Sequence, residues 1–227
     1  WLASYLLVAF LVSAVALAVT VDSHRSASVW LMLLFIGSYA ISSRIEFEIG
    51  TGCTVPTQLV LIPMLVLLPV PYVPLCVLAG LLLGELPDYV RGRLAVNRSA
   101  LRFVNSWHAV GPALVLVAAG EPEPTPRHLP IYTAALCAQF VFDFGSTALR
   151  DWIGRDVPPL SLVRYMVWIW AVDSALTPIA ILAALGATAL VVGCGTESHP
   201  NDPRPPLSAA PPSTAARAWT VVRTTLL

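Results

Sequence analysis

Charged residues are scarce in this chain of 227 residues, and the two signs balance. Asp, Glu, Lys and Arg make up 11% of the sequence, with 13 basic and 13 acidic side chains. Nucleic-acid binding depends on neutralising phosphates with Lys and Arg. A chain with a formal net charge of zero has no such basic field, so nucleic acid is not an expected partner.

The motifs of common enzyme classes are also missing. The sequence has no GxSxG elbow, no HExxH, no Walker phosphate loop and no CxxC pair. Its cysteines, Cys53, Cys76, Cys137 and Cys194, lie far apart, and no histidine follows them at zinc-ligand spacing. We therefore predict no catalytic residues, no metal site and no cofactor, and we expect the cysteines to act as small apolar side chains.

Hydrophobic residues dominate instead, at 57% of the chain with a mean hydropathy of +0.76. Lipid cannot satisfy exposed backbone groups, so a membrane admits only helices and closed barrels, and the alternation typical of barrel strands is absent. The sequence predicts an all-α fold, a polytopic transmembrane bundle of about six to seven helices within residues 1–193. The apolar runs are residues 1–21, 27–42, 55–71, 72–86, 103–119, 131–149 and 165–193.

The third and fourth of these runs are irregular. Both are short for a full crossing, and they contain Pro56, Pro63, Pro69 and Pro74. Proline removes a backbone donor and kinks a helix. The two runs predict either two bent helices or one re-entrant pair that is shielded by its neighbours.

The loops between the runs differ in charge. Arginines cluster in residues 91–102 and again in residues 150–164, whereas residues 121–124 read Glu-Pro-Glu-Pro. Loops rich in Lys and Arg stay on the cytoplasmic side of a membrane. We therefore place both arginine clusters inside the cell, the acidic connector outside, and the protein in a bacterial cytoplasmic membrane as a multi-pass protein.

Both ends of the chain are unusual. The first apolar run starts at Trp1 with no initiator Met, so we expect a fragment. Residues 194–227 are rich in Pro, Ser and Ala, a composition that buries too little apolar surface to offset the entropy of ordering. We expect this segment to be a disordered or aberrant tail.

A few polar residues interrupt the apolar runs and would be costly to expose to lipid. They are Asp143, Asp173, His108, Gln139 and Gln58. One hypothesis joins them in a pocket between helices that binds a small solute or relays a proton. The alternative is that they only form hydrogen bonds between helices, which stabilise a bundle without any ligand.

Three further patterns have structural as well as functional explanations. Glu46 and Glu48 alternate with apolar residues before Gly50 and Gly52, which fits a solvated edge or a glycine-hinged ligand gate. Most Trp and Tyr residues flank the runs, as expected for an aromatic belt at the headgroups. The GxxxG motif of residues 80–84 predicts close helix packing.

Several segments also suggest a family. Residues 47–60 (FEIGTGCTVPTQLV), 83–89 (LGELPDY), 106–113 (SWHAVGPA) and 142–144 (FDF) are the ones that carry the likeness. Through them the chain resembles the N-terminal membrane region of bacterial HD-type (HD-GYP) phosphohydrolases and GGDEF diguanylate cyclases. The likeness extends over roughly two thirds of the chain and implies a multi-helix membrane sensor.

In that family the sensor passes its signal through a last helix to a cytoplasmic enzyme of cyclic dinucleotide metabolism. This chain departs from the pattern after about Leu190 and has no His-Asp dipeptide and no GGDEF run. We therefore expect a sensory input module for signal transduction without its output enzyme, and the alternative is a small-solute transporter or its substrate-binding subunit. Expected partners are membrane lipid and a small-molecule ligand at Asp143, Asp173, His108, Gln139, Gln58 and Glu48, with a homodimer left open.

Overall fold

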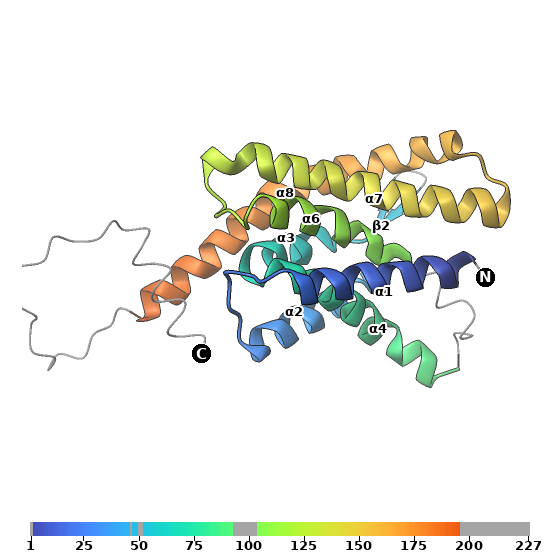
Figure 1. Ribbon diagram of the computed structural model, residues 1–227. Coiled ribbons are helices and arrows are strands. Elements are labelled where there is room, and N and C mark those ends of the chain that lie inside the picture. Colours follow the sequence, from blue (N-terminus) through green and yellow to red (C-terminus); the bar gives the residue numbers. More distant parts are fainter. Residues whose placement is uncertain (1, 46, 50–51, 93–103, 196–227) are drawn as a thin grey trace, which may run out of the picture.

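The computed structural model describes residues 2–45, 47–49, 52–92 and 104–195, and the predicted helical class is confirmed (Figure 1). The helices pack side by side, and most lie along one common direction. Their bounds are α1 Leu2–Thr20, α2 Val29–Ser42, α3 Gln58–Leu67, η1 Val70–Tyr72, α4 Val73–Val90, η2 Val104–Ala109, α6 Val110–Ala118, η3 Pro126–His128, α7 Leu129–Arg155 and α8 Pro159–Gly195. The predicted tail of residues 194–227 lies outside the described residues, apart from the two that end α8.

One element departs from the predicted all-α fold. Strands β1 (Phe47–Ile49) and β2 (Gly52–Thr54) form an antiparallel hairpin between α2 and α3. The alternating pattern before Gly50 is the signal for this hairpin, because successive residues of a strand point to opposite faces. Each strand has only three residues, too few to stand out from its apolar surroundings.

Two helical segments are long and apolar enough to cross a membrane, Val70–Val90 and Met166–Gly186. The other apolar helices within the described ranges are shorter. Helix α3, for example, has 10 residues, which span about 15 Å at 1.5 Å per residue. Length and composition therefore give two candidate membrane-spanning helices in the described ranges, and the six to seven predicted crossings stay a prediction.

The pairing of α2 with α4 depends on the two glycines of the GxxxG motif. A Cβ atom at Gly80 would lie 2.9 Å from the Cβ of Tyr39, and one at Gly84 would lie 3.0 Å from the backbone oxygen of Ala40. Neither position has room for a side chain. The predicted role of Gly80 and Gly84 in close helix packing is confirmed.

Helix α3 ends where prolines remove its backbone donors. Pro69 has no N–H, so the carbonyl of Leu65 loses its usual helical partner four residues on. The guanidinium of Arg25, from the α1–α2 connection, donates to that carbonyl at 2.6 Å. A side chain 40 positions away thus satisfies the end of α3.

Arg25 also binds the α6–α7 connection at this end of the bundle. The side chain is 5% exposed and lies 3.7 Å from the carboxylate of Glu121. It donates to the carbonyls of Glu121 and Pro122, both at 3.0 Å, and the hydroxyl of Ser23 donates to Glu121 Oε2 at 2.6 Å. Oε1 of Glu121 is buried and has no hydrogen-bond partner in the described part of the chain.

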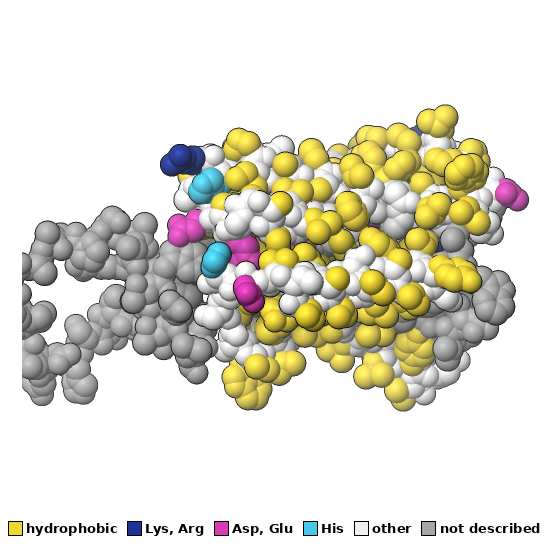
Figure 2. All heavy atoms as spheres, in the orientation of Figure 1, with side chains coloured by type: hydrophobic (Ala, Val, Ile, Leu, Met, Phe, Trp, Pro, Cys, Tyr) yellow, Lys and Arg dark blue, Asp and Glu magenta, His cyan; other side chains and the backbone are white. Residues whose placement is uncertain are grey.

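A different set of charged side chains lies at the opposite end. Arg44 after α2 pairs with Asp88 in α4. Arg150 of α7 donates to Asp151 at 3.0 Å and to the side chain of Asn105 in η2 at 3.2 Å. On the face seen in Figure 2, hydrophobic side chains cover the middle of the bundle and charged side chains gather towards its two ends.

The main hydrophobic core lies where α3, η1, α4 and α6 meet α2 and α7. Side chains from all of these elements are buried against one another. Smaller clusters join α1 to α4 and α6, and α3 to α8. The fully buried members of the main core include Met64, Leu68, Val70, Val73, Val77, Ala109 and Ala113.

Candidate functional site

The polar residues of the apolar runs meet in the interior of the bundle, and two glutamines form the tightest link. Gln58 at the start of α3 is 1% exposed, and Gln139 near the middle of α7 is 3% exposed. Their amides bond reciprocally, with N···O distances of 3.3 and 2.8 Å. The second N–H of Gln58 reaches the hydroxyl of Thr177 in α8 at 3.1 Å, so three helices share this network.

A second polar pair lies between α2 and η2. The phenol oxygen of Tyr39 is 3.0 Å from Nε2 of His108, and the two rings stack with centroids 6.5 Å apart. The other ring nitrogen, Nδ1, contacts the carbonyl of Asn105. A carbonyl only accepts, so Nδ1 of His108 donates to Asn105, and Nε2 shares the second hydrogen bond with the Tyr39 hydroxyl.

Two carboxylates, Asp143 of α7 and Asp173 of α8, lie between these pairs. They interact electrostatically with each other, and Asp143 also interacts with His108 and Arg150. Both also interact with the phenol of Tyr39. Both side chains are half-buried, and no hydrogen bond to either carboxylate is formed within the described ranges.

Two places with fewer helical hydrogen bonds lie beside the cluster, one inside α8 and one at the start of α3. The hydroxyl of Thr177 donates back to the carbonyl of Asp173 at 2.7 Å, and the next residue, Pro178, cannot donate to Ser174. Helix α3 begins beside the cluster at Gln58, after Thr57, whose side chain is within hydrogen-bonding reach of Tyr39. The polar side chains therefore lie where the backbone of α8 and α3 is least regular.

Aromatic rings pack between α7 and α8 within one turn of the aspartates in sequence. Trp170 of α8 stacks on Phe140 with centroids 5.5 Å apart and meets Phe144 edge-on at 6.0 Å. The indole N–H of Trp170 is buried and has no partner in the described part of the chain. These rings therefore link α7 to α8.

The structure thus brings together five of the six residues proposed for ligand binding: Asp143, Asp173, His108, Gln139 and Gln58. Glu48 is in β1, paired in the backbone register with Cys53, and the position of its side chain lies outside what the structure describes. Its role as part of a ligand gate stays a prediction.

Three contributors were not predicted as site residues. Tyr39 fits the sequence pattern of a headgroup belt, but this prediction is wrong for it, because its side chain is 1% exposed and faces His108. Thr57 and Thr177 were also missed. The signal for Thr177 is its position one turn after Asp173, on the same helix face.

The arrangement offers hydrogen-bonding groups and two carboxylates in an apolar bundle. In the described ranges, no group of three or more His, Cys, Asp or Glu side chains is placed to hold a metal ion. Cys76 is buried and Cys137 is exposed, and both are free thiols.

No known protein family, curated protein or solved structure matches the chain.

Proposed function

We propose that this chain is a membrane-embedded sensory input module that crosses a bacterial cytoplasmic membrane several times. The observation that carries the proposal is the polar cluster described above, which draws on α2, α3, η2, α7 and α8 inside an otherwise apolar bundle. Intramembrane ionisable groups are costly to bury, and they usually mark a binding site or a relay.

The contacts at the two ends of the bundle support a multi-pass arrangement. Arg25 links the α1–α2 connection to α3 and to the α6–α7 connection, so these segments meet at one end. Arg44 with Asp88 and Arg150 with Asn105 link α2 to α4 and α7 to η2 at the other. In a membrane, α1, α2, α4, η2 with α6, α7 and α8 would each pass between these ends, and α3 would cover about half the distance.

A ligand acts on such a module by binding one arrangement of the helices better than another. The side-chain amides of Gln58 and Gln139 are hydrogen-bonded to each other, which favours a role in helix packing over ligand binding for that pair. Asp143 and Asp173 have no such partners among the described residues, so they are the groups with capacity left for a ligand. Since they lie on α7 and α8, a ligand between them would change how these two helices pack.

A fusion protein tests this function. The chain is joined after Gly195 to a diguanylate cyclase catalytic domain, and the cyclic dinucleotide level in cells reports the state of the module. Asp143→Asn and Asp173→Asn are expected to change the output, whereas Asp22→Asn, a change of an exposed carboxylate in the α1–α2 connection, leaves it unaltered. Equal output from all three variants would contradict the proposal.

A small-solute transporter is the second candidate, and the short helix α3 favours it. Transporters build their substrate sites from broken helices near the middle of the membrane, and Gln58 begins α3 beside residues from the middle of α7 and α8. Proteoliposomes holding the purified chain separate the two functions: saturable flux of a solute favours a transporter, and binding without flux favours the input module.

A further inference from the structure

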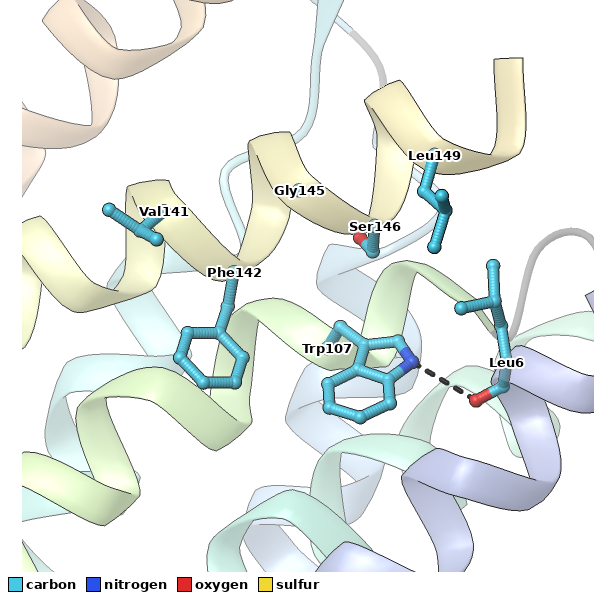
Figure 3. A pocket seen from close by; sticks show the side chains of 7 residues that line it. All are labelled: Leu6, Trp107, Val141, Phe142, Gly145, Ser146 and Leu149. Carbon is cyan, nitrogen blue, oxygen red and sulfur yellow. Dashed lines mark hydrogen bonds between the residues drawn. The ribbon is translucent and has the colours of Figure 1, made fainter. Parts of the chain in front are cut away.

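An open groove runs along the outside of the bundle between α1, η2 and α7, and it is not part of the polar cluster (Figure 3). Its volume is about 300 Å³. Trp107 forms the floor, and its ring stacks on Phe142 with centroids 6.1 Å apart. The lining residues are Leu6, Trp107, Val141, Phe142, Gly145, Ser146 and Leu149.

The groove presents no polar group that needs a partner. The indole N–H of Trp107 already donates to the carbonyl of Leu6 at 3.1 Å, as Figure 3 shows. The hydroxyl of Ser146 donates to the carbonyl of Asp143 at 3.1 Å. An occupant that must form several hydrogen bonds, such as an extended peptide or a sugar, would find one acceptor among the lining side chains, the hydroxyl oxygen of Ser146, whereas a hydrocarbon chain would need none.

The dimensions fit a single hydrocarbon chain. The stripe of α7 from Val141 to Leu149 rises about 12 Å at 1.5 Å per residue. This is close to the roughly 15 Å that one leaflet contributes to a hydrocarbon core of about 30 Å. A helix of that length, about 10 Å across, occupies roughly 900 Å³, about three times the volume of the groove.

We propose that this groove binds one acyl chain of a membrane phospholipid. The headgroup would lie beyond Leu149, next to Arg150. That guanidinium is paired with Asp151 and bonded to Asn105, so the local charge is balanced and favours no particular headgroup. The recognised part of the lipid is therefore its chain.

The inference deepens the proposed function and rests on it for the location in the membrane. Two residues of the groove adjoin the polar cluster in sequence, since Trp107 precedes His108 and Phe142 precedes Asp143. A chain that enters or leaves the groove would move the same segments, η2 and α7, that hold the cluster. The signal that the module reads would then be the acyl composition of the membrane.

Gly145 makes the groove testable. A Cβ atom added there meets nothing within 4 Å, so Gly145→Leu should fill the groove without displacing its walls. Gly154 in the same helix has equally open surroundings but does not line the groove, so Gly154→Leu is the matched control. Val141→Phe narrows the groove from its other end and serves as a second variant.

The full chain has seven tryptophans, so all except Trp107 are replaced by phenylalanine in the parent and in every variant. Each protein is placed in dioleoylphosphatidylcholine vesicles in which brominated phosphatidylcholine replaces increasing fractions of the lipid. We expect bromine to quench Trp107 in the parent and in Gly154→Leu, with a clear loss of quenching in Gly145→Leu and Val141→Phe. Native mass spectrometry should show one retained phospholipid on the parent and none on Gly145→Leu.

Two results would overturn the inference. One is quenching and lipid retention in Gly145→Leu and Val141→Phe equal to those of the parent. The other is retention only of anionic lipids, which would make the headgroup the recognised part. Vesicle flotation separates this failure from a failure of the proposed function: a parent chain that does not float with vesicles contradicts the membrane location itself.

Discussion

Replacing Arg25 with methionine tests whether the buried ion pair holds the two connections at one end of the bundle together. Methionine keeps an unbranched apolar stem and removes the guanidinium. The change leaves the carboxylate of Glu121 buried without its cation, and it leaves the carbonyls of Leu65, Glu121 and Pro122 without the donors that Arg25 supplies.

The magnitude follows from burial. Both side chains of the pair are 5% exposed. Removing one partner of a buried ion pair costs about 3–5 kcal/mol, because the other charge stays buried without compensation. We therefore expect Arg25→Met to lower the free energy of unfolding by about 3–5 kcal/mol, and we expect Arg25→Met combined with Glu121→Leu to lose less than the sum of the single changes.

Arg44 provides the control. It pairs with Asp88, but its side chain is 41% exposed, and exposed ion pairs contribute about 0–1 kcal/mol. The assay is denaturation of the purified chain in detergent micelles, followed by circular dichroism. The reasoning would be refuted if Arg25→Met and Arg44→Met lost the same stability, or if Arg25→Met lost less than about 1 kcal/mol.

The same denaturation assay checks three further predictions. Gly111→Ala would bring a Cβ atom to 2.5 Å from the backbone oxygen of Ala138, so it should cost about 1–3 kcal/mol by overpacking α6 against α7. At Gly37 nothing lies within 4 Å of the new atom, so Gly37→Ala should raise the free energy of unfolding by up to about 1 kcal/mol through helix propensity. An equal effect of Gly111→Ala and Gly37→Ala would contradict this account. Gln58→Leu should lower the free energy of unfolding by about 1–3 kcal/mol, because it leaves the buried amide of Gln139 unpaired. The double variant with Gln139→Leu should recover much of that loss. A double variant as unstable as the sum of the two single changes would show that the amides are not coupled.

Most helices could be predicted from the apolar runs alone. The first run, residues 1–21, and the helix α1 at Leu2–Thr20 nearly coincide, and a polar break marks the start of α2. The ends of α7 and α8 could not be predicted. Helix α7 continues through Arg150 and Asp151, and α8 begins before Arg164, because polar residues do not end a helix. Helix α7 ends only at Asp156, whose backbone is left-handed with φ 55°.

The meeting of Asp143, Asp173, His108, Gln58 and Gln139 could be anticipated, because ionisable and amide side chains inside apolar runs avoid lipid by facing one another. Tyr39 could not be assigned in this way. Tyrosine suits both a headgroup belt and a buried hydrogen bond, and only the approach of η2 to α2 decides between the two. The hydrogen bond from Arg25 to the carbonyl of Leu65 could not be predicted either, because it depends on which connections meet in space.

The contact between α3 and α8 has a mechanical consequence. Ala180 and Ala184, the buried residues of α8 in this contact, are small, and they rest on Ile62 and Val66. Alanine methyl groups make a shallow surface without the ridges of larger side chains, and packed helices shear along surfaces of this kind. The hydrogen bond between Gln58 and Thr177 crosses this contact, so it fixes the lengthwise position of α8 against α3. Loss of that bond would leave only these shallow apolar contacts between α3 and α8, which is the longest helix in the described part of the chain.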